Sequence, residues 1–144
     1  MGLTLNELAK VELAKRNAER TAIEQIYKEK GDVMMENCKI LIKDIILTLN
    51  TIFNDKNKFS VSIYDGRKHY TNGEVVIKIK MNYGYSCADA GCTTLYIQPN
   101  DENFLVATYF DMRDKVSMAQ ETFVKKLIKV EGYKCGSAFR YFIK

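Results

Sequence analysis

The sequence predicts an α+β fold in which helices come first and a mainly antiparallel sheet follows. Apolar residues repeat every three to four positions up to residue 53, which is the helical period. From residue 59 onward they repeat at every second position, and turn dipeptides separate these segments. The expected order of elements is two helices, four strands, a third helix and a fifth strand, ααββββαβ.

Length and composition predict a single folded domain, residues 1–144, because this is the commonest domain size. The hydrophobic fraction of 47% and the charged fraction of 28% are close to globular averages, which argues against disorder. The most apolar run, residues 40–53, contains Lys43 and Asp44, so no membrane span is expected. The N-terminus shows no signal-peptide pattern, and we expect a cytoplasmic protein with reduced cysteines and no cofactor.

The first helix is expected to begin at a capping box, in which Thr4 and Glu7 each satisfy a free backbone N–H of the first turn. A narrow apolar stripe follows at helical spacing, and the pattern indicates a helix that is only partly buried. The stripe consists of Leu8, Val11, Ala14, Ala18, Ala22 and Ile26. Its alanines allow close approach of another helix, either the protein's own second helix or the first helix of a second copy in a homodimer.

A second helix is expected after Gly31, with Asp32 at its start, although one continuous helix that tolerates Gly31 is the alternative. Residues 34–53 carry a broad apolar face and are predicted to form the central core helix. This face consists of Met34, Met35, Cys38, Leu41, Ile42, Ile45, Ile46, Leu49, Ile52 and Phe53.

Four strands are expected next, in two hairpins. Residues 59–64 and 74–81 alternate apolar and polar side chains, and the dipeptides at residues 65–66 and 72–73 bound the connection between them. Residues 92–98 and 104–110 form the second pair around a turn at residues 99–101. A third helix capped by Asp111 or Asp114 is expected to run to Gly132, and residues 136–143 are expected to form the last strand.

The most distinctive segment is the connection at residues 82–92, which combines two tyrosines, two glycines and two cysteines. Tyrosine offers a large rigid contact area and a hydroxyl group at little entropic cost, which suits protein recognition. We therefore predict a partner-binding surface, against the equal alternative of an ordinary connection folded over the sheet. Its predicted residues are Tyr83, Tyr85, Asp89, Tyr64 and Tyr70.

Basic residues gather around the first hairpin and suggest a second kind of site, for nucleic acid. Phosphate attraction together with base stacking on aromatic rings requires such a mixture on one surface. The predicted residues are Lys56, Lys58, Arg67, Lys68, Lys78 and Lys80. The net charge of only +4 weakens this interpretation, and solvated lysines that protect a sheet edge are the preferred alternative.

Metal and catalytic sites have little support in the sequence. The thiols of Cys87, Cys92 and Cys135, completed by His69 or Cys38, have poor spacing for zinc, so no metal is predicted. A single histidine in a basic turn is better explained as solvated surface than as a catalytic base. A small enzyme with Cys87 or Cys92 as nucleophile would require a lowered thiol pKa and is the third hypothesis.

The leading hypothesis is a noncatalytic protein-interaction module that acts by covering a partner's surface. The Lys-, Ile- and Asn-rich composition suggests, as an extension, a phage or mobile-element inhibitor of a host nuclease or ribonucleoprotein complex involved in defence. A nucleic-acid-binding accessory protein that uses the basic hairpin is the main alternative.

Overall fold

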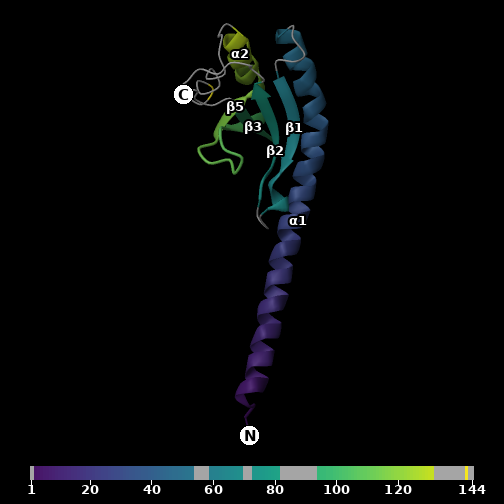
Figure 1. Cartoon of the computed structure of the whole chain (residues 1–144), viewed down its shortest axis with the longest axis vertical. Coiled ribbons are helices and arrows are strands. Elements are labelled where there is room, and N and C mark those ends of the chain that lie inside the picture. Colours follow the sequence, from purple (N-terminus) through teal and green to yellow (C-terminus); the bar gives the residue numbers. More distant parts are fainter. Residues whose placement is uncertain (1, 54–58, 70–72, 82–93, 132–141, 143–144) are drawn as a thin grey trace.

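The computed structural model describes residues 2–53, 59–69, 73–81, 94–131 and 142. It shows one long N-terminal helix, a five-stranded antiparallel sheet and a second helix after the last strand (Figure 1). The α+β prediction is confirmed. The predicted order ααββββαβ is wrong, because a single helix precedes the sheet and five strands, not four, come before the last helix. The fifth strand predicted at 136–143 falls outside the described residues, except for Phe142.

The sheet is a meander in which strands that follow one another in the chain are neighbours in space, in the order β1-β2-β3-β4-β5. Short antiparallel connections favour this arrangement. The elements are α1 (Leu5–Ile52), β1 (Phe59–Asp65), the 3₁₀ turn η1 (Gly66–Lys68), β2 (Val75–Met81), β3 (Thr94–Asn100), β4 (Asn103–Ala107), β5 (Val116–Ala119) and α2 (Gln120–Glu131).

Helix α1 begins at the predicted capping box. The Thr4 hydroxyl accepts a hydrogen bond from the Glu7 backbone N–H at 3.2 Å, and the Thr4 N–H donates to the Glu7 carboxylate at 3.3 Å. The helix then continues through Gly31, so the predicted break at this residue is wrong and Asp32 is an interior helical residue.

Both helices pack on the same face of the sheet. Helix α1 contacts β1, β2 and β3, whereas α2 contacts β4 and β5, and their buried side chains join one core. The core helix predicted at residues 34–53 is confirmed as the second part of α1, where Cys38, Ile45 and Leu49 are buried. The ring of Phe123 on α2 lies 5.2 Å from that of Phe104 and 5.6 Å from that of Phe142, closing the core at this end.

Both predicted hairpins are present. In the first, Phe59 pairs with Met81 and Asp65 with Val75, and the strands close where the Gly66 N–H donates to the Glu74 carbonyl at 2.7 Å. In the second, the turn lies at residues 101–102 rather than 99–101, because Pro99 and Asn100 belong to β3, and Asp101 is in the left-handed region at φ 54°. Aspartate is among the few residues that adopt this conformation readily.

The segment between β4 and α2 differs from the prediction. Neither Asp111 nor Asp114 caps a helix, because residues 116–119 pair with β4 as strand β5 and α2 begins only at Gln120. Residues 108–115 instead cover part of the sheet's outer face, which is the face opposite α1. Met112 is buried there against Val76 and Ala107.

Candidate interaction site

The most prominent feature of the molecule is the free part of α1. Helix α1 has 48 residues and is therefore about 72 Å long, which is far longer than the sheet it covers. Residues 5–30, called the arm below, project past the sheet toward the N-terminus (Figure 1). Every residue from 2 to 30 is exposed, so the prediction of a partly buried first helix is wrong for the isolated chain.

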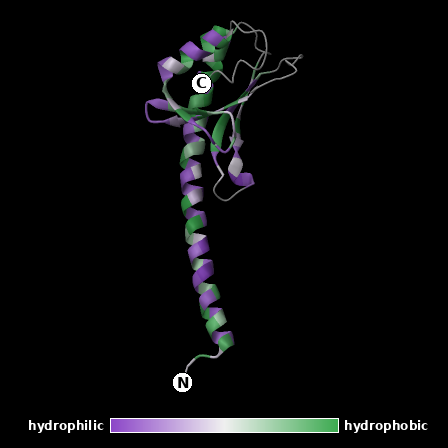
Figure 2. Cartoon of the chain, turned by 90° about the vertical axis from the view of Figure 1, so that its left-hand side faces the viewer, coloured by the Kyte–Doolittle hydropathy of each residue, from purple (hydrophilic) through white to green (hydrophobic). Residues whose placement is uncertain are grey.

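The arm carries large apolar side chains in water. They alternate with charged residues along its length, as the hydropathy colours of Figure 2 show. These exposed residues are Leu5, Leu8, Val11, Leu13, Ile23, Ile26 and Tyr27. Local interactions also support the arm, including a Glu12–Lys15 ion pair at 3.6 Å and a hydrogen bond from Gln25 to Glu29 at 3.0 Å.

The apolar pattern continues on the back of the sheet-covered half of α1, residues 31–52. Ile26, Val33, Ile40 and Leu47 follow one another at intervals of seven residues and are 63%, 63%, 73% and 66% exposed. We call these four residues the back stripe. Val33, Ile40 and Leu47 each come two residues after Gly31, Cys38 and Ile45, which are buried. Two residues turn a helix by about 200°, so the back stripe faces away from the sheet.

An arginine clasp fixes the point where the arm leaves the sheet. The Arg67 guanidinium, from η1, donates to both carboxylate oxygens of Asp65 at 2.9 and 3.0 Å and to Asp32 on α1 at 2.7 Å. It also donates to the Lys28 carbonyl at 3.3 Å. These hydrogen bonds lower the pKa of the Asp65 carboxyl and raise the pKa of Arg67.

The clasp explains why a glycine occupies the middle of α1. A Cβ atom at Gly31 would lie 2.8 Å from one terminal nitrogen of Arg67 and 2.9 Å from its Nε atom, and it would collide with Cδ. Glycine weakens a helix, and here it leaves room for a side chain that crosses from the sheet. The sequence shows Gly31 but not this long-range partner, which is why the predicted helix break is wrong.

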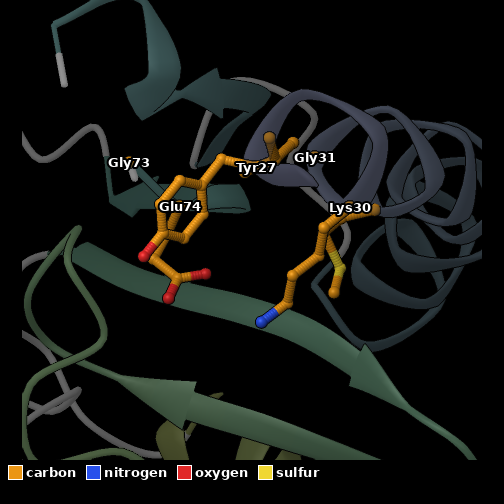
Figure 3. A pocket seen from close by; sticks show the side chains of 7 residues that line it. Tyr27, Lys30, Gly31, Gly73 and Glu74 are labelled. Atoms are coloured by element: carbon orange, nitrogen blue, oxygen red, sulfur yellow. The ribbon is translucent and has the colours of Figure 1, made fainter. Parts of the chain in front are cut away.

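A small cavity of about 230 Å³ lies beside Gly31, between α1 and the start of β2. Figure 3 shows Tyr27 and Lys30 of the arm pointing toward Glu74, which precedes β2. The Glu74 carboxylate accepts a hydrogen bond at 2.6 Å from Gln98, whose amide also donates to the Val75 carbonyl at 3.2 Å. Small-molecule pockets usually enclose about 300–1,000 Å³, so this cavity is better described as a polar seam between arm and sheet.

The predicted nucleic-acid residues are distributed over different surfaces. Lys78 and Lys80 lie on the outer face of the sheet, opposite Tyr96 and Thr94 of β3, respectively. Lys68 is exposed in η1, whereas Arg67 is engaged in the clasp on the side of α1. Lys56 and Lys58 lie outside the described residues. Of the four predicted side chains that are described, two share one face of the sheet.

The predicted partner-binding residues are only partly described. Tyr83, Tyr85, Asp89 and Tyr70 lie outside the described residues. The ring of Tyr64 packs on the outer face at 5.5 Å from the ring of Phe110, and it lies 6.2 Å from the ring of His69. Tyr64 therefore has a packing role whether or not it also contacts a partner.

Cys38 is a buried thiol in the core. Its Sγ atom lies 3.9 Å from the Val75 carbonyl, to which it donates a weak hydrogen bond, and burial raises its pKa to about 11. At neutral pH this thiol is therefore protonated. Cys87, Cys92 and Cys135 lie outside the described residues. Among the residues that are described, no group of three or more His, Cys, Asp or Glu side chains is placed to hold a metal ion.

None of the helices in the described part of the chain is long and apolar enough to cross a membrane. Comparison with family models, with curated proteins and with solved structures finds no match to this chain. The exposed surfaces of the chain are therefore the guide to its function.

The back stripe is the feature that the sequence prediction missed. The expected core face of residues 34–53 left Val33, Ile40 and Leu47 without a role. Their seven-residue spacing, extended backward to Ile26, is the signal that identifies a second apolar line on the same helix. Ile46, which the sequence predicts on the core face, is 40% exposed and lies beside the back stripe.

Proposed function

We propose that the protein is a noncatalytic interaction module whose arm binds a protein partner. The observation that carries this proposal is the exposure of large apolar side chains in two groups on the arm, at residues 5–13 and 23–27. Soluble proteins rarely leave large apolar side chains gathered in water in this way unless they form an interface. An amphipathic helix that lies in or along a partner is a common mode of protein recognition.

The energetics of the arm support the same proposal. A helix without tertiary contacts is only marginally stable in water, and most helical stability in proteins comes from packing of an apolar face. The arm's capping box and its side-chain pairs each contribute little. Packing against a partner would supply the stability that the arm lacks in the isolated chain.

Substitutions of exposed arm residues test the proposal without disturbing the core. Leu8→Glu combined with Ile26→Glu places charge on the arm, where these side chains are 44% and 63% exposed. A tagged chain expressed in its native cell should capture a partner, either another protein or untagged copies of the chain, and the double variant should lose it. Ile128→Glu is the matched control, because Ile128 is 55% exposed on α2. Equal capture by the wild-type chain, the double variant and Ile128→Glu would show that the arm does not bind the partner.

The loop at residues 82–92 remains a proposed second contact with the same partner. Tyr83→Ala combined with Tyr85→Ala should weaken capture while the thermal unfolding temperature stays the same. A host nuclease or ribonucleoprotein among the captured proteins would support the extension to a phage or mobile-element inhibitor. Rapid alkylation of Cys87 or Cys92, well above the rate of a free thiol, would instead favour the cysteine-dependent enzyme.

Nucleic-acid binding is the second candidate function, and the outer face of the sheet favours it. Lys78 pairs with Tyr96 across β2 and β3, which places a cation beside an aromatic ring on this face. Binding should then fall steeply between about 50 and 200 mM salt, and Lys78→Glu with Lys80→Glu should abolish it. Absence of binding to DNA and RNA at low salt would eliminate this candidate.

A further inference from the structure

The apolar line on α1 extends over both halves of the helix. On the arm it includes Leu5, Leu8, Val11, Ala18, Ala22 and Ile26, and on the sheet-covered half it includes Val33, Ile40, Ile46 and Leu47. All of these residues are exposed. In a seven-residue repeat with Ile26 at position a, they occupy positions a, d and g, the seam of a coiled coil and one flank. Gly31, Cys38 and Ile45 then occupy position f, on the opposite side, where the sheet lies.

We propose that a second copy of this chain packs along the line in an antiparallel arrangement. The arm of each copy then covers the back of the other copy's sheet-covered half, and the sheets lie on the two outer sides. This inference rests on the proposed function and names the partner of the arm. It accounts for two exposed surfaces at once, the arm and the back stripe, because each is the other's counterpart.

The charges along the line determine the direction of pairing. A parallel dimer in register would place every charged residue at positions a and d beside its own copy. These residues are Glu12, Lys15, Glu19, Glu29, Glu36 and Lys43. Like charges at such close positions are destabilising.

An antiparallel register avoids most of these contacts. When residues whose numbers add up to 55 face one another, Glu12 lies opposite Lys43, which is an attractive pair. Leu8 lies opposite Leu47 and Ala22 opposite Val33 in the same register. The only like-charge pairing among the charged a and d residues is that of Glu19 with Glu36, which occurs twice in the symmetric dimer.

The line is large enough for a stable dimer. From Leu5 to Leu47 it is about 63 Å long, and a helix is about 10–12 Å wide. It therefore offers about 700 Å² on each copy, close to the roughly 800 Å² per partner of a standard interface. A lipid surface fits less well, because acidic and basic residues are mixed along the helix rather than collected into a basic polar face.

Cross-linking of the full chain tests the arrangement directly. A carbodiimide joins a carboxylate to an amine only when the two are in contact. Within one chain Glu12 and Lys43 are separated by about 46 Å of helix, so a link between them must join two copies. We expect sedimentation to show a dimer and mass spectrometry to find the Glu12–Lys43 link.

Val33→Glu combined with Leu47→Glu should raise the dimer dissociation constant at least about 100-fold, because their aliphatic contacts with Ala22 and Leu8 of the other copy are replaced by charge. Both residues are 63% or more exposed and face away from the sheet, so the fold should be kept. Ile128→Glu on α2 is the control and should leave both the dimer and the cross-link unchanged.

Several results would overturn the proposal. These are a chain that stays monomeric at all concentrations up to about 1 mM, a dimer that survives the double substitution, and links that join equal positions of two copies. Binding of the monomer to lipid vesicles through the back stripe would also overturn it. A monomeric chain whose arm still captures a different protein would retain the proposed function, whereas one that captures nothing would refute both.

Discussion

The two halves of α1 form one continuous helix for different reasons. Residues 31–52 lie against the sheet, and Cys38, Ile45 and Leu49 are almost completely buried. Residues 5–30 have no buried side chain and depend on local interactions, which begin with the Thr4 cap. Tertiary packing stabilises the helix at residues 31–52. At residues 5–30 the helix depends on the helix propensity of the sequence, which makes it only marginally stable.

This difference indicates where stability and function reside. Substitutions of the buried residues on the sheet-covered half should change the free energy of unfolding of the whole molecule. Substitutions on the arm should mainly change helix content and association. The arginine clasp of Arg67, Asp65 and Asp32 lies where the arm meets the sheet-covered half of α1.

The largest expected effect separates two isoleucines on the same helix. Ile45→Ala removes a side chain that is 3% exposed and should cost about 2–5 kcal/mol of unfolding free energy. Ile26→Ala, at a position that is 63% exposed, should cost less than about 0.5 kcal/mol in the monomer. Urea titration at a concentration where the chain is monomeric measures both values. Similar losses for the two variants would show that the arm is packed within a single chain.

The second effect concerns the clasp. Asp65→Asn removes charge-assisted hydrogen bonds from Arg67 and should cost about 1.5–3 kcal/mol near neutral pH. Asp32→Asn is the matched control and should cost less than about 1 kcal/mol, because the Asp32 side chain is 58% exposed. Urea titration at neutral pH compares the two variants.

The clasp should also make stability depend on pH. The Arg67 hydrogen bond lowers the pKa of Asp65 in the folded chain below its unfolded value of about 3.9. Its stabilisation is therefore complete above the unfolded pKa and is lost as pH falls through the folded pKa. The difference between the wild-type chain and Asp65→Asn should shrink below about pH 4. A difference that stays constant to pH 2 would contradict this assignment.

The third effect is the change in stability caused by Gly31→Ala, which should have opposite signs in the presence and absence of the Arg67 side chain. Alanine is a better helix former than glycine by about 1 kcal/mol, but its Cβ would displace the Arg67 side chain. Gly31→Ala should therefore destabilise the wild-type chain, whereas in an Arg67→Ala background it should stabilise the protein by about 1 kcal/mol. The double-mutant cycle is measured by urea titration. The same sign in both backgrounds would mean that Arg67 is not the reason for the glycine.

Gly31 also shows what the sequence could and could not predict. Local signals were sufficient for the capping box at Thr4, the core face around Ile45 and the hairpin between β1 and β2, because each depends on residues close in the chain. The reason for a glycine inside α1 is Arg67, a partner that only the folded structure supplies. The sequence predicts a helix where β5 lies, because the pairing of β5 with β4 is a tertiary contact that the local pattern does not reveal.

The candidate site also depends on α1 being a single helix. The sequence indicated an apolar stripe on the first helix but placed its continuation after Gly31 in the core. Once α1 is a single helix, Val33 and Ile40 fall into line with Ile26, and the two apolar faces separate. If the helix broke at Gly31, the seven-residue spacing from Ile26 to Val33 would not place them on one face, because spacing defines a face only within a continuous helix.

The smallest expected effect is at the far end of the arm. Thr4→Ala removes the hydroxyl that accepts from the Glu7 N–H and should cost about 0.5 kcal/mol of local helix stability. Far-ultraviolet circular dichroism should show a loss of helix, and amide exchange should quicken in the first turns, while the urea midpoint stays unchanged. Thr21→Ala, in the middle of the arm, is the matched control and should keep or increase helix content, because alanine is the better interior residue. If Thr4→Ala lowers the urea midpoint, the arm is coupled to the core, and the two halves of α1 do not behave as separate regions.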